Sequence, residues 1–177
     1  VNGLSPAPVA LILPLAILVG VIGLLYIMRA ARLKRDFASG RFVLDASIGG
    51  LAGMMLVLSV ANMLYGMGYA VDIQRIVLLA VTVLLILIGN ALPKSQKNFV
   101  AGIRLPWTLR DAANWRVTHR WAGRSMVVCG LIAFVVIALG VPNPWPFAVV
   151  MASIIVPAGI AILVSYTYAL RHGEAQD

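Results

Sequence analysis

Negative charge is scarce in this sequence, and so are the residues that most enzyme and metal sites require. Six acidic residues stand against fourteen basic ones, and the chain has two histidines and one cysteine, Cys129. A lone cysteine can form neither an intrachain disulfide nor a metal–thiolate cluster, so we expect no metal and no cofactor. Neither an HExxH motif nor paired aspartates occur, which excludes the intramembrane proteases that depend on them.

Apolar sequence, by contrast, is abundant. Of the 177 residues, 62% are hydrophobic and only 11% are charged, and the mean hydropathy is +0.97. A soluble domain is nearer about half apolar, whereas a helix needs roughly 20 apolar residues to cross a bilayer. We therefore predict an all-α, polytopic membrane protein that forms one membrane domain over residues 1–177.

Five apolar runs are long enough to span a bilayer, and we place them at about residues 8–28, 47–70, 73–92, 121–141 and 145–170. The second and third must be separated by a bend near Asp72 and Arg75, because charged side chains are costly in hydrocarbon. A proline-rich turn at residues 142–146 separates the last two. No run carries a charged residue or a histidine in its middle, which argues against a proton-coupled transporter.

The basic residues gather on one side of the five predicted spans. Residues 29–45 and 94–124 lie on the same side as the C-terminus, and 13 of the 14 basic residues fall there, Arg75 being the exception. Because cytoplasmic loops are rich in Lys and Arg, we predict an outside N-terminus and a cytoplasmic C-terminus. The first run is followed, not preceded, by its basic residues, so we expect a retained span, not a cleaved signal. Basic residues beside apolar runs suit anionic lipids, and we expect no nucleic-acid partner.

A polar segment, residues 98–124, separates the third and fourth predicted spans and contains three tryptophans, five arginines and a histidine. Thr108, followed three residues later by Asp111, resembles a capping box. We therefore predict a cytoplasmic amphipathic helix over residues 109–124 that leads into the fourth span. Two sets of side chains then follow helical spacing: one face of Trp115, Thr118, His119 and Ala122, and an arginine stripe of Arg116, Arg120 and Arg124.

Two roles for this helix are open. In the first, it is an anchor at the membrane interface, with its tryptophans at head-group depth and the arginine stripe on lipid phosphates. In the second, His119, Arg104 and Trp107 together bind a peptide, a lipid head group or a partner protein. No serine or cysteine nucleophile pairs with His119 convincingly, so we predict no catalytic residue.

Short motifs with fixed spacing run from the third predicted span towards the fourth. They are Gly89-Asn90, Leu92-Pro93-Lys94, Asn98-Phe99, Gly102-Ile103-Arg104, Pro106-Trp107-Thr108-Leu109, Trp115 and Thr118-His119-Arg120. Over about residues 85–135 this pattern resembles the SdpI/YfhL family of bacterial membrane proteins. The resemblance implies a non-enzymatic protein of the bacterial inner membrane, acting in immunity to a toxic peptide or in signalling by holding a cytoplasmic repressor at the membrane.

The motif loop, residues 93–120, is the segment where we expect a partner to bind. The candidate partner- or ligand-binding residues are Asn98, Gly102, Arg104, Pro106, Trp107, Thr108, Trp115, His119 and Arg120. The expected partners are the lipid bilayer and a cytoplasmic regulator or toxin peptide. Two alternatives remain open. One is an accessory structural subunit of a larger membrane complex, and the other is a lipid- or peptide-handling enzyme or transporter in which His119 and the arginines contact phosphate.

Overall fold

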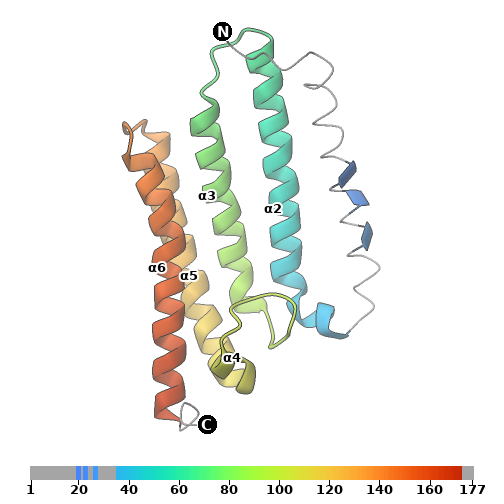
Figure 1. The fold of residues 1–177 in the computed structure, drawn as a ribbon, viewed down its shortest axis with the longest axis vertical. Helices are drawn as coiled ribbons and strands as arrows, with labels where there is room; N and C mark the ends of the chain where they lie inside the picture. The colour runs from blue at the N-terminus through green and yellow to red at the C-terminus, as the bar shows by residue number, and fades with distance from the viewer. Residues whose placement is uncertain (1–18, 21, 24–25, 28–34, 173–177) are drawn as a thin grey trace.

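The computed structural model is all-helical in the part of the chain that it describes, which is residues 19–20, 22–23, 26–27 and 35–172 (Figure 1). Five α-helices and one short 3-10 helix follow one another there, without a strand. They are α2 (Arg35–Gly66), α3 (Ile73–Ala91), η1 (Leu92–Lys94), α4 (Pro106–Arg110), α5 (Ala112–Ala138) and α6 (Trp145–Arg171). The first predicted span, residues 8–28, lies outside the described residues except at six isolated positions.

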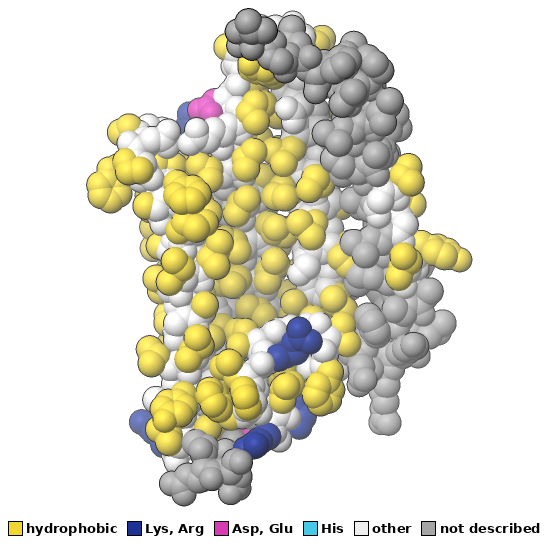
Figure 2. Space-filling model, in the orientation of Figure 1, with side chains coloured by type: hydrophobic (Ala, Val, Ile, Leu, Met, Phe, Trp, Pro, Cys, Tyr) yellow, Lys and Arg dark blue, Asp and Glu magenta, His cyan; other side chains and the backbone are white. Residues whose placement is uncertain are grey.

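Four of these helices are long and apolar enough to cross a membrane: Ala38–Gly66, Ile73–Lys94, Ala112–Ala138 and Trp145–Arg171. They stand side by side as long rods, and hydrophobic side chains cover the middle of the visible face (Figures 1 and 2). Lipid can solvate such a surface, whereas water cannot do so cheaply. The chain is therefore a multi-pass helical membrane protein, as its composition predicts.

The predicted bounds agree closely with α3 and α6 and less well with α2. Asp72 begins α3 by accepting the N–H of Arg75 at 3.0 Å, which confirms the predicted bend. The helix that contains most of the second predicted span, residues 47–70, differs from it at both ends, because it begins at Arg35 and ends at Gly66. Its first turns carry charged residues and so resemble a loop in sequence, while Gly68, with φ of +90°, belongs to the turn that ends it.

The predicted helix over residues 109–124 has the wrong start. Thr108 is not its N-cap: the threonine lies inside the short helix α4, and its hydroxyl accepts the N–H of Leu105 at 2.9 Å. Asp111 is extended and ends α4, and its carboxylate accepts two N–H groups of the first turn of α5, at 2.7 and 2.9 Å. A carboxylate caps a helix well because it offers two acceptors to otherwise free donors. The remaining residues form the first half of α5, continuous with the fourth span, and no separate amphipathic helix stands in this described region.

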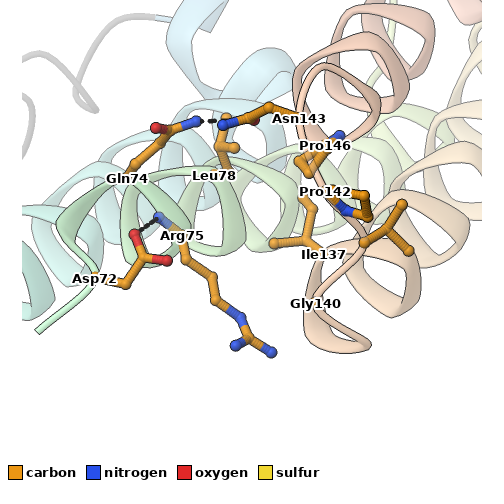
Figure 3. Close-up of a pocket in the computed structure, with 10 residues that line it drawn as sticks. Asp72, Gln74, Arg75, Leu78, Ile137, Gly140, Pro142, Asn143 and Pro146 are labelled. Carbon is orange, nitrogen blue, oxygen red and sulfur yellow. Dashed lines mark hydrogen bonds between the residues drawn. The ribbon is translucent and has the colours of Figure 1, made fainter.

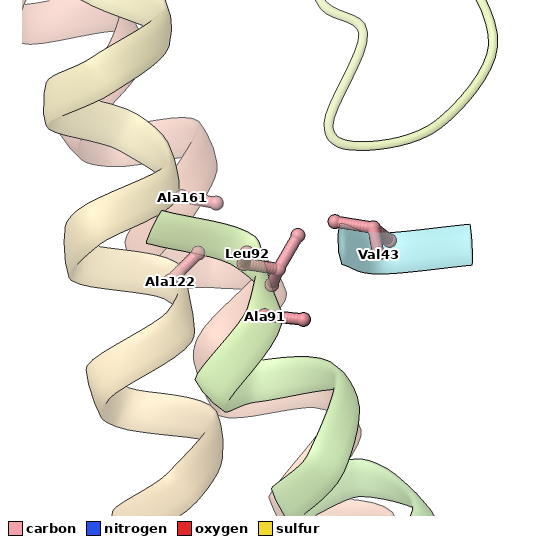
Figure 4. Packing of buried hydrophobic residues seen from close by; sticks show 5 residues of the cluster. All are labelled: Val43, Ala91, Leu92, Ala122 and Ala161. Carbon is pink, nitrogen blue, oxygen red and sulfur yellow. The ribbon is translucent and has the colours of Figure 1, made fainter. Parts of the chain in front are cut away.

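Small residues bring the helices together at the end of the bundle that holds α4. Val43, Ala91, Leu92, Ala122 and Ala161 form a cluster that joins all four long helices (Figure 4). Close to it, a Cβ on Gly123 would collide with the carbonyl oxygen of Gly89, and one on Gly89 would lie 3.0 Å from that of Gly123. Small residues permit such backbone contact between membrane helices. The approach of α3 to α5 fixes both ends of the loop that joins them.

Candidate functional site

The connection between α3 and α5 carries most of the candidate residues, and His119 of α5 binds it from the protein interior. The His119 side chain is fully buried, and its Nε2 accepts the backbone N–H of Ile103 at 2.9 Å. Because Nε2 is an acceptor, the proton lies on Nδ1, which donates to the carbonyl of Trp115 at 2.9 Å. Both ring nitrogens are thus bonded to backbone, and neither is left for a ligand in this arrangement.

Trp115 supports the same loop. Its ring stacks on the His119 imidazole with centroids 4.0 Å apart, and its Nε1 donates to the carbonyl of Ser95 at 3.2 Å. The side chain is fully buried in protein, so Trp115 does not contact lipid head groups as the anchoring role would require. Helical spacing alone does not distinguish a face turned to lipid from one covered by a folded loop. Trp121, which is 53% exposed, is better placed for an interfacial role.

Gly102 is the point where the loop passes closest to these rings. Its φ is +125°, a conformation that residues with a Cβ rarely adopt. A Cβ built there would collide with Nε2 of His119 and would lie 3.0 Å from the Trp115 ring. The family-like Gly-Ile-Arg motif therefore begins with a glycine because the backbone must pass over an imidazole.

Asn98 and Thr108 fold the loop onto itself. The Asn98 side chain is 2% exposed, and its Oδ1 accepts the N–H groups of Val100 and Ala101 at 2.8 Å each. Thr108, fully buried, shares its hydroxyl with the backbone of Ile103 and Leu105. These bonds satisfy backbone groups that a buried loop would otherwise leave unpaired. Both residues therefore shape the loop.

The remaining candidates lie at the surface. Arg104, Pro106 and Arg120 are exposed, as are Arg116 and Arg124 of the arginine stripe. The Arg104 guanidinium donates to the carbonyl of Phe99 at 2.7 Å, and the Phe99 ring is 66% exposed. We call Phe99, Arg104 and Pro106 the exposed motif face.

Trp107 is intermediate between the buried and the exposed candidate residues. It is half-buried and packs against Tyr166 of α6, with ring centroids 5.6 Å apart. Its indole Nε1 is buried without a hydrogen-bond partner, the only such side-chain atom found in the described part of the chain. The three residues predicted to act together make different contacts: His119 accepts from Ile103, Arg104 donates to Phe99, and Trp107 packs on α6.

A buried polar cluster between α5 and α6 was not predicted from the sequence. Asn114, fully buried on α5, donates to the backbone carbonyl of Ser165 on α6 at 3.1 Å. Its Oδ1 accepts hydroxyl groups from Thr118 and Ser165, at 3.0 and 3.1 Å. Interhelical hydrogen bonds of this kind hold membrane helices in register. The i, i+4 spacing of Asn114 and Thr118, on the face that contains His119, was the available signal.

Asp111 sets the junction between α4 and α5. Burial works to raise the pKa of this carboxyl, but the N–H donors of Ala113 and Asn114, helped by the charge of Arg116, outweigh it, so the pKa lies below its ordinary value. The carboxylate is therefore ionised at neutral pH, and it places a negative charge at the N-terminus of a long helix, where the helix dipole favours it.

The opposite end of the bundle holds a cavity of about 260 Å³ that contains none of the predicted site residues (Figure 3). Gln74 donates to the side chain of Asn143 at 3.2 Å and so links the first turn of α3 to the connection between α5 and α6. The guanidinium of Arg75 donates to the carbonyl of Ala138 in the last turn of α5. A cation suits the negative end of a helix, which gives Arg75 a structural role.

Comparison with known proteins identifies the segment that contains the candidate site. Residues 94–169 match the sequence model of the SdpI/YfhL protein family. The predicted family resemblance is confirmed. The matched segment covers the motif loop from residue 94, with α4, α5 and nearly all of α6. It begins later than the predicted 85–135 and extends further towards the C-terminus.

A curated protein to which the chain is similar is the Immunity protein SdpI of Bacillus subtilis (strain 168). It is 30% identical over 115 residues, which cover 65% of this chain and 55% of that protein. The match thus spans just over half the length of the relative. No solved structure matches the chain.

Proposed function

We propose that this protein is a non-enzymatic, SdpI-like protein of the bacterial inner membrane that acts through its motif loop. Its role is immunity to a toxic peptide, or signalling through a cytoplasmic regulator. The support is the SdpI/YfhL segment over residues 94–169 and the relative named for immunity. All nine candidate binding residues lie inside that segment.

One observation carries the proposal: the motif divides into a buried half and an exposed half. His119, Trp115 and Asn98 are at most 2% exposed and bond the loop to α5 and to itself. Arg104 and Pro106 stand at the surface of the same loop. Binding sites gain from pre-organisation, because less conformational entropy is lost when a partner binds. The buried half thus presents the exposed half in one conformation.

The distribution of charge supports a cytoplasmic location for this loop. Among the described side chains, the basic residues other than Arg75 belong to the end of the bundle that holds α4, and Figure 2 shows Lys and Arg gathered there on the visible face. The positive-inside rule associates such an end with the cytoplasm. The occupied ring nitrogens of His119 favour a binding role over acid–base catalysis.

The proposal is tested in a bacterial strain that lacks its own immunity protein of this family and is challenged with the toxin that this protein counters. We expect the chain to protect the strain, and Arg104→Ala and Trp107→Ala to lose that protection at equal membrane abundance. Arg171→Ala, which removes an exposed charge from α6 at the same end, is the matched control and should protect. The proposal would be contradicted if Arg104→Ala and Trp107→Ala both protected the strain fully and co-purified with the same partner proteins as the wild type.

A second candidate, an accessory subunit of a larger membrane complex, is favoured by a groove between α2 and α3. This apolar cavity of about 440 Å³ includes Gly49 and Gly53, and a Cβ on either would meet no described atom within 4 Å. Glycines let another helix approach closely. Native mass spectrometry in mild detergent distinguishes the candidates: co-purified foreign subunits, lost in Gly53→Leu but not in Gly159→Leu, support this one, whereas a lone monomer or homo-oligomer counts against it.

A further inference from the structure

A cavity of about 490 Å³ lies between the start of α2 and the beginning of the loop that follows α3. The buried motif residues His119, Trp115 and Asn98 do not line it, and it shares no lining residue with the groove between α2 and α3. Its lining residues are Ala38, Ser39, Arg41, Phe42, Lys94, Gln96 and Lys97.

The cavity is strongly cationic. Arg41 comes from α2, and Lys94 and Lys97 come from more than 50 positions later in the chain, yet all three line one space. No acidic side chain is among the lining residues that the structure describes. Like charges that line one space repel one another, and a bound anion relieves that repulsion. The charge pattern is therefore that of an anion site.

The walls of the cavity are held together by short contacts. The backbone N–H of Gln96 donates to the carbonyl of Ser39 at 3.1 Å, which ties the loop to α2. A Cβ on Gly40 would lie only 3.1 Å from the side-chain oxygen of Asn98, so α2 and the loop approach closely there as well. The three cations are thus presented by backbone that is bonded across the cavity.

The depth of the cavity indicates the source of the anion. The candidate membrane span of α2 begins at Ala38 and that of α3 ends at Lys94, so both walls of the cavity lie at the ends of candidate spans. Phe42 on the cavity wall is 41% exposed, and Phe99, five residues after Lys94, is 66% exposed. A ligand in this cavity meets three cations with its polar part and the apolar ring of Phe42 beside them, a combination that suits a phospholipid better than a soluble anion.

We propose that this cavity binds the phosphate of an anionic phospholipid. The guanidinium of Arg41, which lies 4.7 Å over the Phe42 ring, and the ammonium groups of Lys94 and Lys97 hold the phosphate oxygens. Lys97 also donates to the carbonyl of Arg110 at 3.4 Å, which uses one of its three donors. An occupied cavity links the start of α2 to the motif loop through the lipid.

The test uses the full chain in mild detergent and native mass spectrometry with titrated phosphatidylglycerol or phosphatidylcholine. The cavity variant combines Arg41→Gln and Lys94→Gln, and the matched control combines Arg110→Gln and Arg171→Gln, two exposed arginines that line no part of the cavity. Both remove two exposed positive charges from the same end of the bundle. We expect wild type to prefer phosphatidylglycerol, and the cavity variant to bind it roughly tenfold to a hundredfold more weakly while the control changes little.

Equal weakening in the two double variants, or no preference over phosphatidylcholine in wild type, overturns the proposal. Full displacement of phosphatidylglycerol by equimolar glycerol phosphate also overturns it, because a free phosphate would then be the better ligand. A charge-retaining variant, with Arg41→Lys and Lys94→Arg combined, should bind like wild type. Circular dichroism of each variant checks that the helices are intact, and the lipid preference of wild type tests the proposal without any variant.

Discussion

Gly102 passes over His119 so closely that a Cβ at this position would collide with the imidazole Nε2, the atom that accepts the N–H of the next residue, Ile103. The loop and the ring therefore fit each other only when position 102 is glycine and position 119 offers an acceptor at that point. This pair fixes where the motif loop crosses α5, and it makes the exposed motif face depend on buried contacts.

Gly102→Ala should destabilise the protein more than any strain at φ alone would. A non-glycine residue at positive φ costs about 1–3 kcal/mol, and at this position the collision with His119 adds to it. Gly68→Ala is the matched control, because Gly68 has φ of +90° but open space around its Cβ position. Unfolding by titration with a denaturing detergent measures both. A Gly102→Ala variant as stable as Gly68→Ala would contradict the close contact.

His119→Ala should free the motif loop. The variant leaves the N–H of Ile103 without its acceptor, which costs about 1–3 kcal/mol for a buried donor. We expect faster hydrogen–deuterium exchange at Ile103 and in the rest of residues 99–105. Exchange in the C-terminal half of α5 should be unchanged. His172→Ala is the control, since His172 is exposed and bonds only within its own helix end. Unchanged exchange at residues 99–105 would show that another contact holds the loop.

The stability of the α4–α5 junction should depend on pH through Asp111. The pKa of this carboxyl is lower in the folded protein than in the unfolded chain, where it is about 3.9. Its stabilisation is therefore complete above the unfolded pKa and is lost as the pH falls through the folded value. Asp111→Asn keeps a capping oxygen that does not titrate.

We accordingly expect the wild type to lose more of its free energy of unfolding than Asp111→Asn between about pH 6 and about pH 3. Asp111→Ala, which caps at neither pH, should lower stability by about 0.5–2 kcal/mol at neutral pH. Identical pH profiles for the wild type and Asp111→Asn would show that the carboxylate contributes no more than a neutral cap.

The contact between α3 and α5 predicts a large effect of a small change at Gly123. A Cβ there would collide with the carbonyl of Gly89 and would crowd Pro93, so Gly123→Ala must push the helices apart. Overpacking of this kind costs about 1–3 kcal/mol. Gly159→Ala on α6 has open space and should be neutral or stabilising by about 0.5–1 kcal/mol. Equal stability of the two variants would refute backbone contact at Gly123.

The membrane spans could be read from the sequence because hydrophobic length is a direct physical requirement of the bilayer. The bounds of α3 and α6 follow from Asp72 and from the prolines before Pro146, which act locally. The start of α2 could not be predicted from apolar length, because its first turns carry charged residues. These turns extend the apolar helix beyond the apolar run. The first span, residues 8–28, lies outside the described residues.

The candidate site was predicted in its residues but not in its arrangement. Helical spacing placed Trp115 and His119 on one face, which is confirmed, but whether lipid or protein covers that face depends on the path of residues 95–105. Thr108 and Asp111 both have capping side chains, and only the break at Asp111 decides which of them begins the long helix. The cavity at Arg41 joins segments far apart in sequence, which no local pattern indicates.

The most direct test of the account compares stability and protection in the same variants. A double variant, Arg104→Ala with Pro106→Ala, alters the exposed motif face, whereas His119→Ala alters its buried support. We expect the double variant to keep the unfolding midpoint of the wild type but to fail to protect cells from the toxin. His119→Ala should have a lower unfolding midpoint and should also fail to protect. Full protection by the double variant at equal membrane abundance would contradict the claim that the exposed face carries the function.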